Sequence, residues 1–256
     1  MAPWLWLTLS FLGQQPPPSD VFHGWQAERD HRFVWIQDRQ KVGETLLRWT
    51  PLKSADKSPP TQWKIESRRS YDRPGNSQRA TSSTVCDSAG RISTYEDSVE
   101  LTANVGKKAS QQTTIEIKGE KARVSYRQSG KAEPPMEASL PDGARLAAAQ
   151  AIEHWILFLS QWPRESTDQV QKLFYPDFGK VLSVAFKKVG DEKLRIGSGE
   201  ITATKLTFDA AKDSLSGAVW LDSASRMVQI EFLNALKPEL SLRVTLAEDS
   251  PRKVSK

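Results

Sequence analysis

Apolar and polar residues alternate along most of the chain. The clearest run is Leu240–Leu246, in which every second residue is apolar, and Val228–Phe232 repeats the pattern. A period of two places successive side chains on opposite faces of a β-strand. Antiparallel strands commonly bury one of these faces and leave the other in water. The pattern therefore predicts a mainly β chain of antiparallel strands, about ten to twelve in number.

Short polar segments separate the alternating runs and predict tight turns. They are Asp38–Gln40, Asp87–Gly90, Lys118–Lys121, Gly190–Glu192, Ile196–Glu200 and Asp222–Ser225, and Pro51–Pro60 predicts a longer polar loop. Because a long flat sheet would expose its edges, this regular spacing favours a meander that curls into a half-barrel or an open barrel.

One long segment, Ala132–Gly179, breaks the alternation. Its apolar residues recur at helical spacing, namely Ala148, Ile152, Trp155 and Leu159. Asp142 would cap the helix and Pro163 would end it, which predicts a helical insertion over about residues 142–162. The second half of the helix is apolar on most sides and must be covered on most sides. We therefore expect it to pack on the concave side of the curled sheet.

The two ends of the chain differ from the middle. Trp4–Leu12 is apolar and Pro16–Pro18 follows it. The run is shorter than the roughly 20 residues that span a bilayer, but it has the length of a signal-peptide core. Residues 1–20 therefore predict a leader with a proline-rich spacer and an extracytoplasmic location, periplasmic or secreted. We expect residues 21–247 to form a single β-rich domain, with two subdomains as the alternative, and residues 248–256 to form a flexible tail.

Composition narrows the function classes. The formal net charge is +5, and short basic clusters such as Arg68–Arg69 lie among acidic residues along the whole chain. This scatter predicts a solvated face of mixed charge and no nucleic-acid partner, although weak contact with an anionic membrane surface stays open. A single cysteine and three histidines argue against a disulfide framework and a metal site. No cofactor and no particular protein partner are predicted.

Candidate catalytic residues are few. Asp97 shares the apolar face of its predicted strand with Tyr95 and Val99. A buried carboxylate must be paired, hydrogen-bonded or neutral, so we expect Asp97 to have a partner or to lie at a rim. His154 is expected on the exposed surface of the predicted helix. No catalytic residue is assigned, and a hydrolase that uses Asp97 or His154 in one cleft is the third hypothesis.

Aromatic residues give the leading hypothesis. Two of the nine tryptophans lie in the leader, and most of the others fall on predicted strands or on the helix. Such side chains can line a cavity for an acyl chain or another lipid-like ligand. The candidate binding residues are Trp35, Trp49, Trp63, Tyr95, Asp97, Trp155, Leu159 and Trp220. The alternative is a structural or protein-interaction domain, in which the same side chains fill the core and no ligand binds.

Two local patterns have counterparts in known proteins. Trp35–Gly43 contains a first hairpin with a Val-Gly step, and Gly217–Val228 contains a strand that ends in Trp-Leu-Asp, a turn and a returning apolar strand. In this the chain resembles exported half-barrel proteins, which include the lipoprotein carriers of the bacterial periplasm, over about residues 30–247. The resemblance implies a curved antiparallel sheet whose concave side, partly covered by helix, holds an acyl chain. It implies no individual binding residues.

Overall fold

The structure is a computed structural model. It describes residues 25–52, 61–103, 106, 108–148, 150–162, 167–176, 179–210, 215–234, 236–237 and 240–247. The predicted leader, residues 53–60 of the predicted loop and the predicted tail lie outside the described residues.

Strands dominate the part of the chain that the structure describes. The first nine are β1 (Asp30–Gln37), β2 (Gln40–Leu52), β3 (Gln62–Arg73), β4 (Asn76–Asp87), β5 (Ile92–Ala103), β6 (Lys108–Lys118), β7 (Lys121–Gln128), β8 (Lys131–Ala132) and β9 (Met136–Ser139). After these come β10 (Arg145–Leu146), the helix α1 (Ile152–Leu159), β11 (Asp168–Tyr175), β12 (Lys180–Ile196), β13 (Gly199–Ala210), β14 (Leu215–Leu221), β15 (Met227–Leu233) and β16 (Leu242–Leu246).

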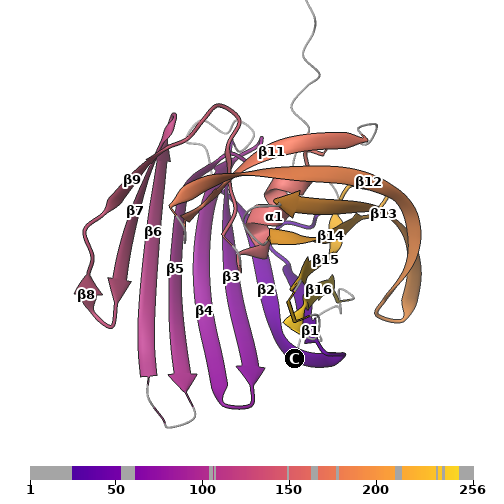
Figure 1. Cartoon of the computed structure of the whole chain (residues 1–256), viewed down its shortest axis with the longest axis horizontal. Coiled ribbons are helices and arrows are strands. Elements are labelled where there is room, and N and C mark those ends of the chain that lie inside the picture. The colour runs from indigo at the N-terminus through magenta and orange to yellow at the C-terminus, as the bar shows by residue number, and fades with distance from the viewer. Residues whose placement is uncertain are drawn as a thin grey trace, which may run out of the picture.

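All of these strands belong to one large sheet. Its order is β10-β11-β12-β13-β14-β15-β16-β1-β2-β3-β4-β5-β6-β7-β8, and β9 pairs with β7. Two meanders are thus joined where β1 pairs with β16. Figure 1 shows β2 to β7 as one broad wall, with β11 and β12 running across its upper part. The prediction of a mainly β chain with a large, curved, non-closed antiparallel sheet is confirmed.

The strand count is higher than the sequence predicts. The described residues form 16 strands in the sheet, against the expected ten to twelve. Three of them, β8, β9 and β10, contain only two to four residues. Strands this short carry too few residues to show an alternating pattern, so the pattern could not reveal them. The expectation for the segment 132–179 was also wrong at its end, because β11 forms an eight-residue strand there.

Most of the predicted turns are confirmed. Asp38 and Arg39 both have positive φ, 47° and 61°, as a type I′ hairpin turn requires at its two central positions. Gly190–Glu192 is the exception, because it lies inside β12. The register with β13 shifts between Lys188 and Gly190. A β-bulge therefore uses the glycine that the sequence analysis assigned to a turn.

The helix is shorter than predicted. It covers Ile152–Leu159, and Ala151 stands at its N-cap without a capping side chain; Asp142 does not cap it. Upstream of the helix, Leu146 pairs in parallel with β11, and the Ala147 N–H donates to the carbonyl of Phe174 at 2.9 Å. Because the sheet edge satisfies these backbone groups, this stretch is extended and the helix begins later.

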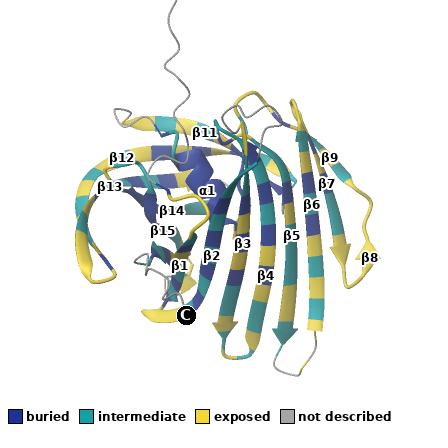
Figure 2. Cartoon of the chain, turned by 180° about the vertical axis from the view of Figure 1, so that it is seen from behind, coloured by how far each residue is buried: buried dark blue, intermediate teal, exposed yellow. Residues whose placement is uncertain are grey.

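Both meanders contact α1. Trp155 packs against Phe208 of β13, with ring centroids 5.0 Å apart, and Phe158 packs against Phe186 of β12 at 5.2 Å. In the other meander, the His154 ring lies edge-on to Tyr95 of β5. All eight residues of α1 are consequently buried, as its dark blue ribbon in Figure 2 shows. Within the described residues, no helix is long and apolar enough to cross a membrane.

Candidate ligand-binding site

An ion pair between an arginine of β3 and a carboxylate of β5 lies next to α1. Arg69 of β3 has the same parity as the fully buried Ile65, so both side chains lie on one face of the sheet. The guanidinium of Arg69 donates to Asp97 of β5 in a short ion pair. The Arg69 side chain is only 5% exposed and that of Asp97 is 14% exposed. The expected partner for Asp97 is confirmed, but the solvated face expected at Arg69 is wrong for this residue.

A second carboxylate reaches the same place from the helix. Glu153 is fully buried, and its Oε1 accepts a hydrogen bond from the Ser82 hydroxyl at 2.6 Å. Among the described residues, its Oε2 and the Nε of Arg69 have no hydrogen-bond partner. Burial raises the pKa of Glu153, and the positive charge of Arg69 opposes that rise. Burial alone would lower the pKa of Arg69, but Tyr95, Glu153 and Asp97 together raise it. Arg69 is therefore a permanent cation in this cluster.

His154 lies beside this cluster and is 1% exposed, so its predicted place on the helix surface is wrong. Its Nδ1 accepts a hydrogen bond from the Ala148 N–H at 3.2 Å, and its Nε2 lies 3.4 Å from the Thr84 hydroxyl. Burial, and secondly the charge of Arg69, lowers the pKa of His154 to about 3. The ring is consequently neutral at pH 7, with its proton on Nε2.

This geometry does not support the hydrolase hypothesis. Asp97 is engaged by Arg69, and the protonated Nε2 of His154 cannot accept the proton of the Thr84 hydroxyl. Cys86 is fully buried, and burial followed by the charge of Asp87 raises its pKa to about 12, so it is a thiol rather than a thiolate. The described residues contain no group of three or more side chains that could hold a metal ion.

Two cavities flank the cluster. Cavity A measures about 260 Å³ and cavity B about 410 Å³. Both are lined by Arg69, Gln78 and Gln150, and the Gln78 amide donates to the Gln150 carbonyl at 2.6 Å. Cavity A adds Trp35, Ser70, Tyr71, Arg73 and Leu242 to these shared residues. Cavity B adds mainly Tyr95, Asp97, Val99, Leu101 and Tyr126. The site thus combines aromatic and aliphatic walls with a small number of polar groups.

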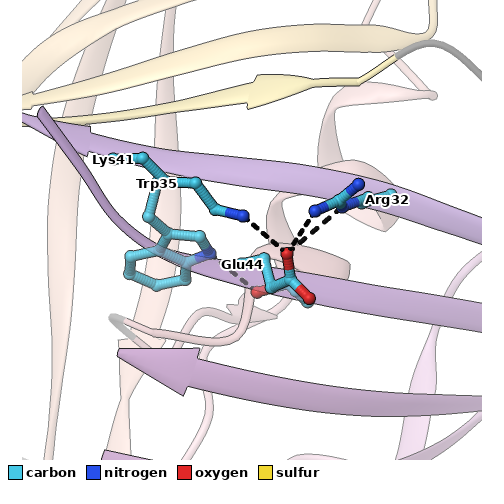
Figure 3. A network of polar contacts seen from close by, with 5 residues as sticks. Arg32, Trp35, Lys41 and Glu44 are labelled. Carbon is cyan, nitrogen blue, oxygen red and sulfur yellow. Dashed lines mark hydrogen bonds and ion pairs between the residues drawn. The ribbon is translucent and has the colours of Figure 1, made fainter. Parts of the chain in front are cut away.

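Trp35, Tyr95 and Asp97 are the three predicted site residues that line these cavities. Trp35 packs edge-on against Tyr71, and its Nε1 donates to the Thr45 hydroxyl at 2.7 Å. Figure 3 shows this bond together with the contacts of Glu44, whose carboxylate accepts hydrogen bonds from Arg32 and Lys41. Hydrogen bonds from Lys41 and then Arg32 lower the pKa of Glu44.

The other five candidates lie apart from the two cavities. Trp49 is fully buried against Trp25, Trp63 packs at the edge of the same core, and Trp155 and Leu159 are buried in α1. Trp220 adjoins Val219, which the register places on the same face as Trp35, so Trp220 is on the opposite face. There its Nε1 donates to Glu192 at 2.9 Å, and Lys205 lies over its ring.

The Trp35–Thr45 bond gives a first testable expectation. Thr45→Val keeps the shape of the side chain but leaves the buried Trp35 Nε1 without an acceptor, which lowers the free energy of unfolding by about 1–2 kcal/mol. Urea denaturation measures the loss. The matched control is Thr50→Val on the opposite face of β2, where we expect a change within about 0.5 kcal/mol. Equal losses in the two variants would show that this bond does not hold Trp35.

Several residues of the site were not among the sequence candidates. They are Arg69, Tyr71, Arg73, Gln78, Gln150 and Glu153. The sequence could have indicated Arg69, Tyr71 and Arg73, because they lie at every second position after Trp63 and Ile65 on the same strand and so share their face. Glu153 gave no such signal, since a charged residue on a helix is normally exposed.

No family model matches the chain, and no curated protein matches it either. Among solved structures it is similar to a beta-barrel-like protein with a domain of unknown function, DUF1849, from Brucella abortus. The TM-score is 0.55 at 10% identity, covering 87% of this chain and 97% of that one. This likeness shows the fold alone. It agrees with a half-barrel architecture, and the lipoprotein-carrier type is not confirmed.

Two further structures are similar at a lower level. One, from Bacteroides fragilis, is provisionally described as an exported protein with a YmcC-like fold; its TM-score is 0.30 at 11% identity, with 86% of this chain and 94% of that one covered. The other, from Parabacteroides distasonis, is provisionally described as a lipoprotein; its TM-score is 0.32 at 9% identity, with 87% and 95% covered.

Proposed function

We propose that this chain is an exported, non-enzymatic binding protein that holds an apolar or amphipathic, lipid-like small molecule in the concavity of its curved sheet. The supporting observation is the pair of adjoining cavities, A and B, whose walls combine Trp35, Tyr71 and Leu242 with Tyr95 and Leu101. In this proposal α1 lies on the concave side, and Gln150, shortly before the helix, lines both cavities. The proposal includes no cofactor and no nucleic-acid partner.

The size and chemistry of the cavities fit a small ligand. Ligand pockets usually measure about 300–1,000 Å³ and are mainly apolar with a few placed polar groups. Cavity B, at about 410 Å³, falls in this range, and cavity A, at about 260 Å³, lies just below it. Each CH₂ group removed from water contributes about 0.8 kcal/mol. An alkyl chain of modest length therefore supplies useful affinity.

Export is part of the proposal because of the apolar run Trp4–Leu12 and the prolines that follow it. An extracytoplasmic place would bring a carrier of this kind close to membranes, and the net charge of +5 favours weak contact with an anionic membrane surface.

A structural or protein-interaction domain is the second candidate. The observation that favours it is the burial of Trp49, Trp155 and Leu159 in one continuous core, away from cavities A and B. On this alternative the aromatic side chains serve packing, and the two cavities are gaps between side chains that hold only water.

Titration with a fluorescent fatty acid separates the two candidates. A binding protein gives saturable fluorescence with about one probe per chain, and unlabelled octanoate displaces the probe. Native mass spectrometry of the purified protein then shows whether a small molecule copurifies. A linear, non-saturating signal together with a mass equal to the bare chain would leave the structural candidate.

A further inference from the structure

Cavity A differs from cavity B in charge. Among its described lining residues are two arginines, Arg69 and Arg73, and no carboxylate. Asp97 lines cavity B instead. Two glutamine amides, from Gln78 and Gln150, add hydrogen-bond donors to the same wall of cavity A. Cavity A is therefore the positive half of the site.

Both arginines have capacity left to bind a ligand. The Arg69 side chain is 5% exposed, and its Nε has no hydrogen-bond partner in the part of the chain that the structure describes, although the residue lines the cavity. The guanidinium of Arg73 lies 5.0 Å from the centre of the Tyr71 ring, on which it stacks. Within the described chain, no carboxylate forms an ion pair with Arg73. A buried donor without an acceptor is costly, and a ligand anion would supply that acceptor.

The rest of the cavity is apolar. Trp35, Tyr71 and Leu242 form its other walls, and the Trp35 ring is fixed by its bond to Thr45. A molecule that fills cavity A must therefore present a negative group at one end and an aromatic or aliphatic body at the other.

We propose that cavity A binds the anionic group of an amphipathic acid, with Arg69 and Arg73 as its two cationic partners. This deepens the proposed function and rests on it. Guanidinium groups suit carboxylates, sulfonates and phosphates because their N–H donors form paired, charge-assisted hydrogen bonds. Asp97 limits the affinity, because it already neutralises part of the charge on Arg69.

Two dyes with the same ring system test the proposal. Anilinonaphthalene sulfonate carries a sulfonate, phenylnaphthylamine lacks it, and both fluoresce in apolar sites. We expect both dyes to saturate and the sulfonate to bind more tightly. Arg73→Gln should weaken sulfonate binding about tenfold or more and leave phenylnaphthylamine within about twofold. Asp97→Asn should strengthen sulfonate binding, a change that a loss of folding cannot produce.

The matched control is Arg79→Gln, which removes the same charge from an exposed side chain paired with Asp72 on the outer face. It should change neither dye. If phenylnaphthylamine saturates but the sulfonate binds no more tightly, or if Arg73→Gln and Arg79→Gln act alike, the anion site is overturned and the proposed function stands. If neither dye saturates, the proposed function fails and the anion site fails with it.

Competition distinguishes the sources of the anion. Octanoate should displace the sulfonate dye at lower concentration than octanol, and acetate should not displace it. Displacement by acetate as readily as by octanoate would show a site for free small anions and overturn the amphipathic ligand.

Discussion

Arg69→Met is expected to lower the free energy of unfolding by about 3–5 kcal/mol at neutral pH. Methionine fills most of the same volume but leaves the carboxylates of Asp97 and Glu153 without their cation. Glu153 is fully buried, and a buried charge without a partner is among the most costly defects in a folded protein. The loss should therefore shrink when acid protonates the Glu153 carboxyl group.

Urea denaturation at neutral and acidic pH measures both effects. The matched control is Arg68→Met, one residue earlier on the same strand, where the side chain is exposed on the other face. We expect that substitution to change stability by about 0.5 kcal/mol or less. A similar loss in the two variants would mean that the Arg69 charge does not stabilise the fold.

The second large effect is a loss of stability at acidic pH, and it comes from His154. His154 has a pKa of about 3 in the folded chain, against about 6.5 in an unfolded one. Because the unfolded chain binds the proton first, the stability from the neutral ring is present above pH 6.5 and is lost as the pH falls toward 3. Lowering the pH from 7 to 4 should remove about 3 kcal/mol through this residue.

His154→Asn isolates this contribution. The asparagine carbonyl can accept the Ala148 N–H in place of Nδ1, and it does not titrate. Between pH 7 and pH 4, the free energy of unfolding of the original chain should therefore fall by about 3 kcal/mol more than that of this variant. Denaturant curves at several pH values supply the comparison. A difference that is constant with pH would contradict the assignment.

The two proteins must be compared with each other because Glu153 also changes the pH dependence of stability. Its pKa is raised in the folded chain, so its stability contribution is present at low pH and is lost as the pH rises above about 4.3. This trend opposes that of His154 and partly masks it in either protein alone. Glu153 is retained in both proteins, so its contribution largely cancels when they are compared.

Local pattern was enough to predict most of the strands and most of their turns. The Lys118–Lys121 turn joins β6 to β7 as expected, because alternation and turn residues act over a few neighbouring positions. The sequence could not tell the bulge at Gly190 from a turn, because glycine serves both conformations. Nor could it show that Arg145 and Leu146 pair with β11, since that choice depends on an edge brought near by the rest of the sheet.

The site was harder to predict than the fold. Asp97 was found because strand parity put it on the apolar face, and its ion-pair partner then proved to be Arg69 of β3, two strands away in the sheet. Arg69 likewise lies at an alternate position on the apolar face of its strand. The adjacent Arg68 made the two residues look like a solvated basic cluster. His154 and Glu153 were missed for another reason. Helical spacing identifies one buried face, whereas α1 is covered on every side by two meanders.

The junction of β1 with β16 governs how the sheet can assemble. Phe33 and Leu246 are register partners, although nearly the whole described chain separates them. A newly made chain can pair β1 with β2 early, but the other edge of β1 stays open until β16 has been synthesised. Pairings this distant are typical of slow folding, over milliseconds to seconds. During that interval the open edge of β1 is where a growing chain is most exposed to aggregation.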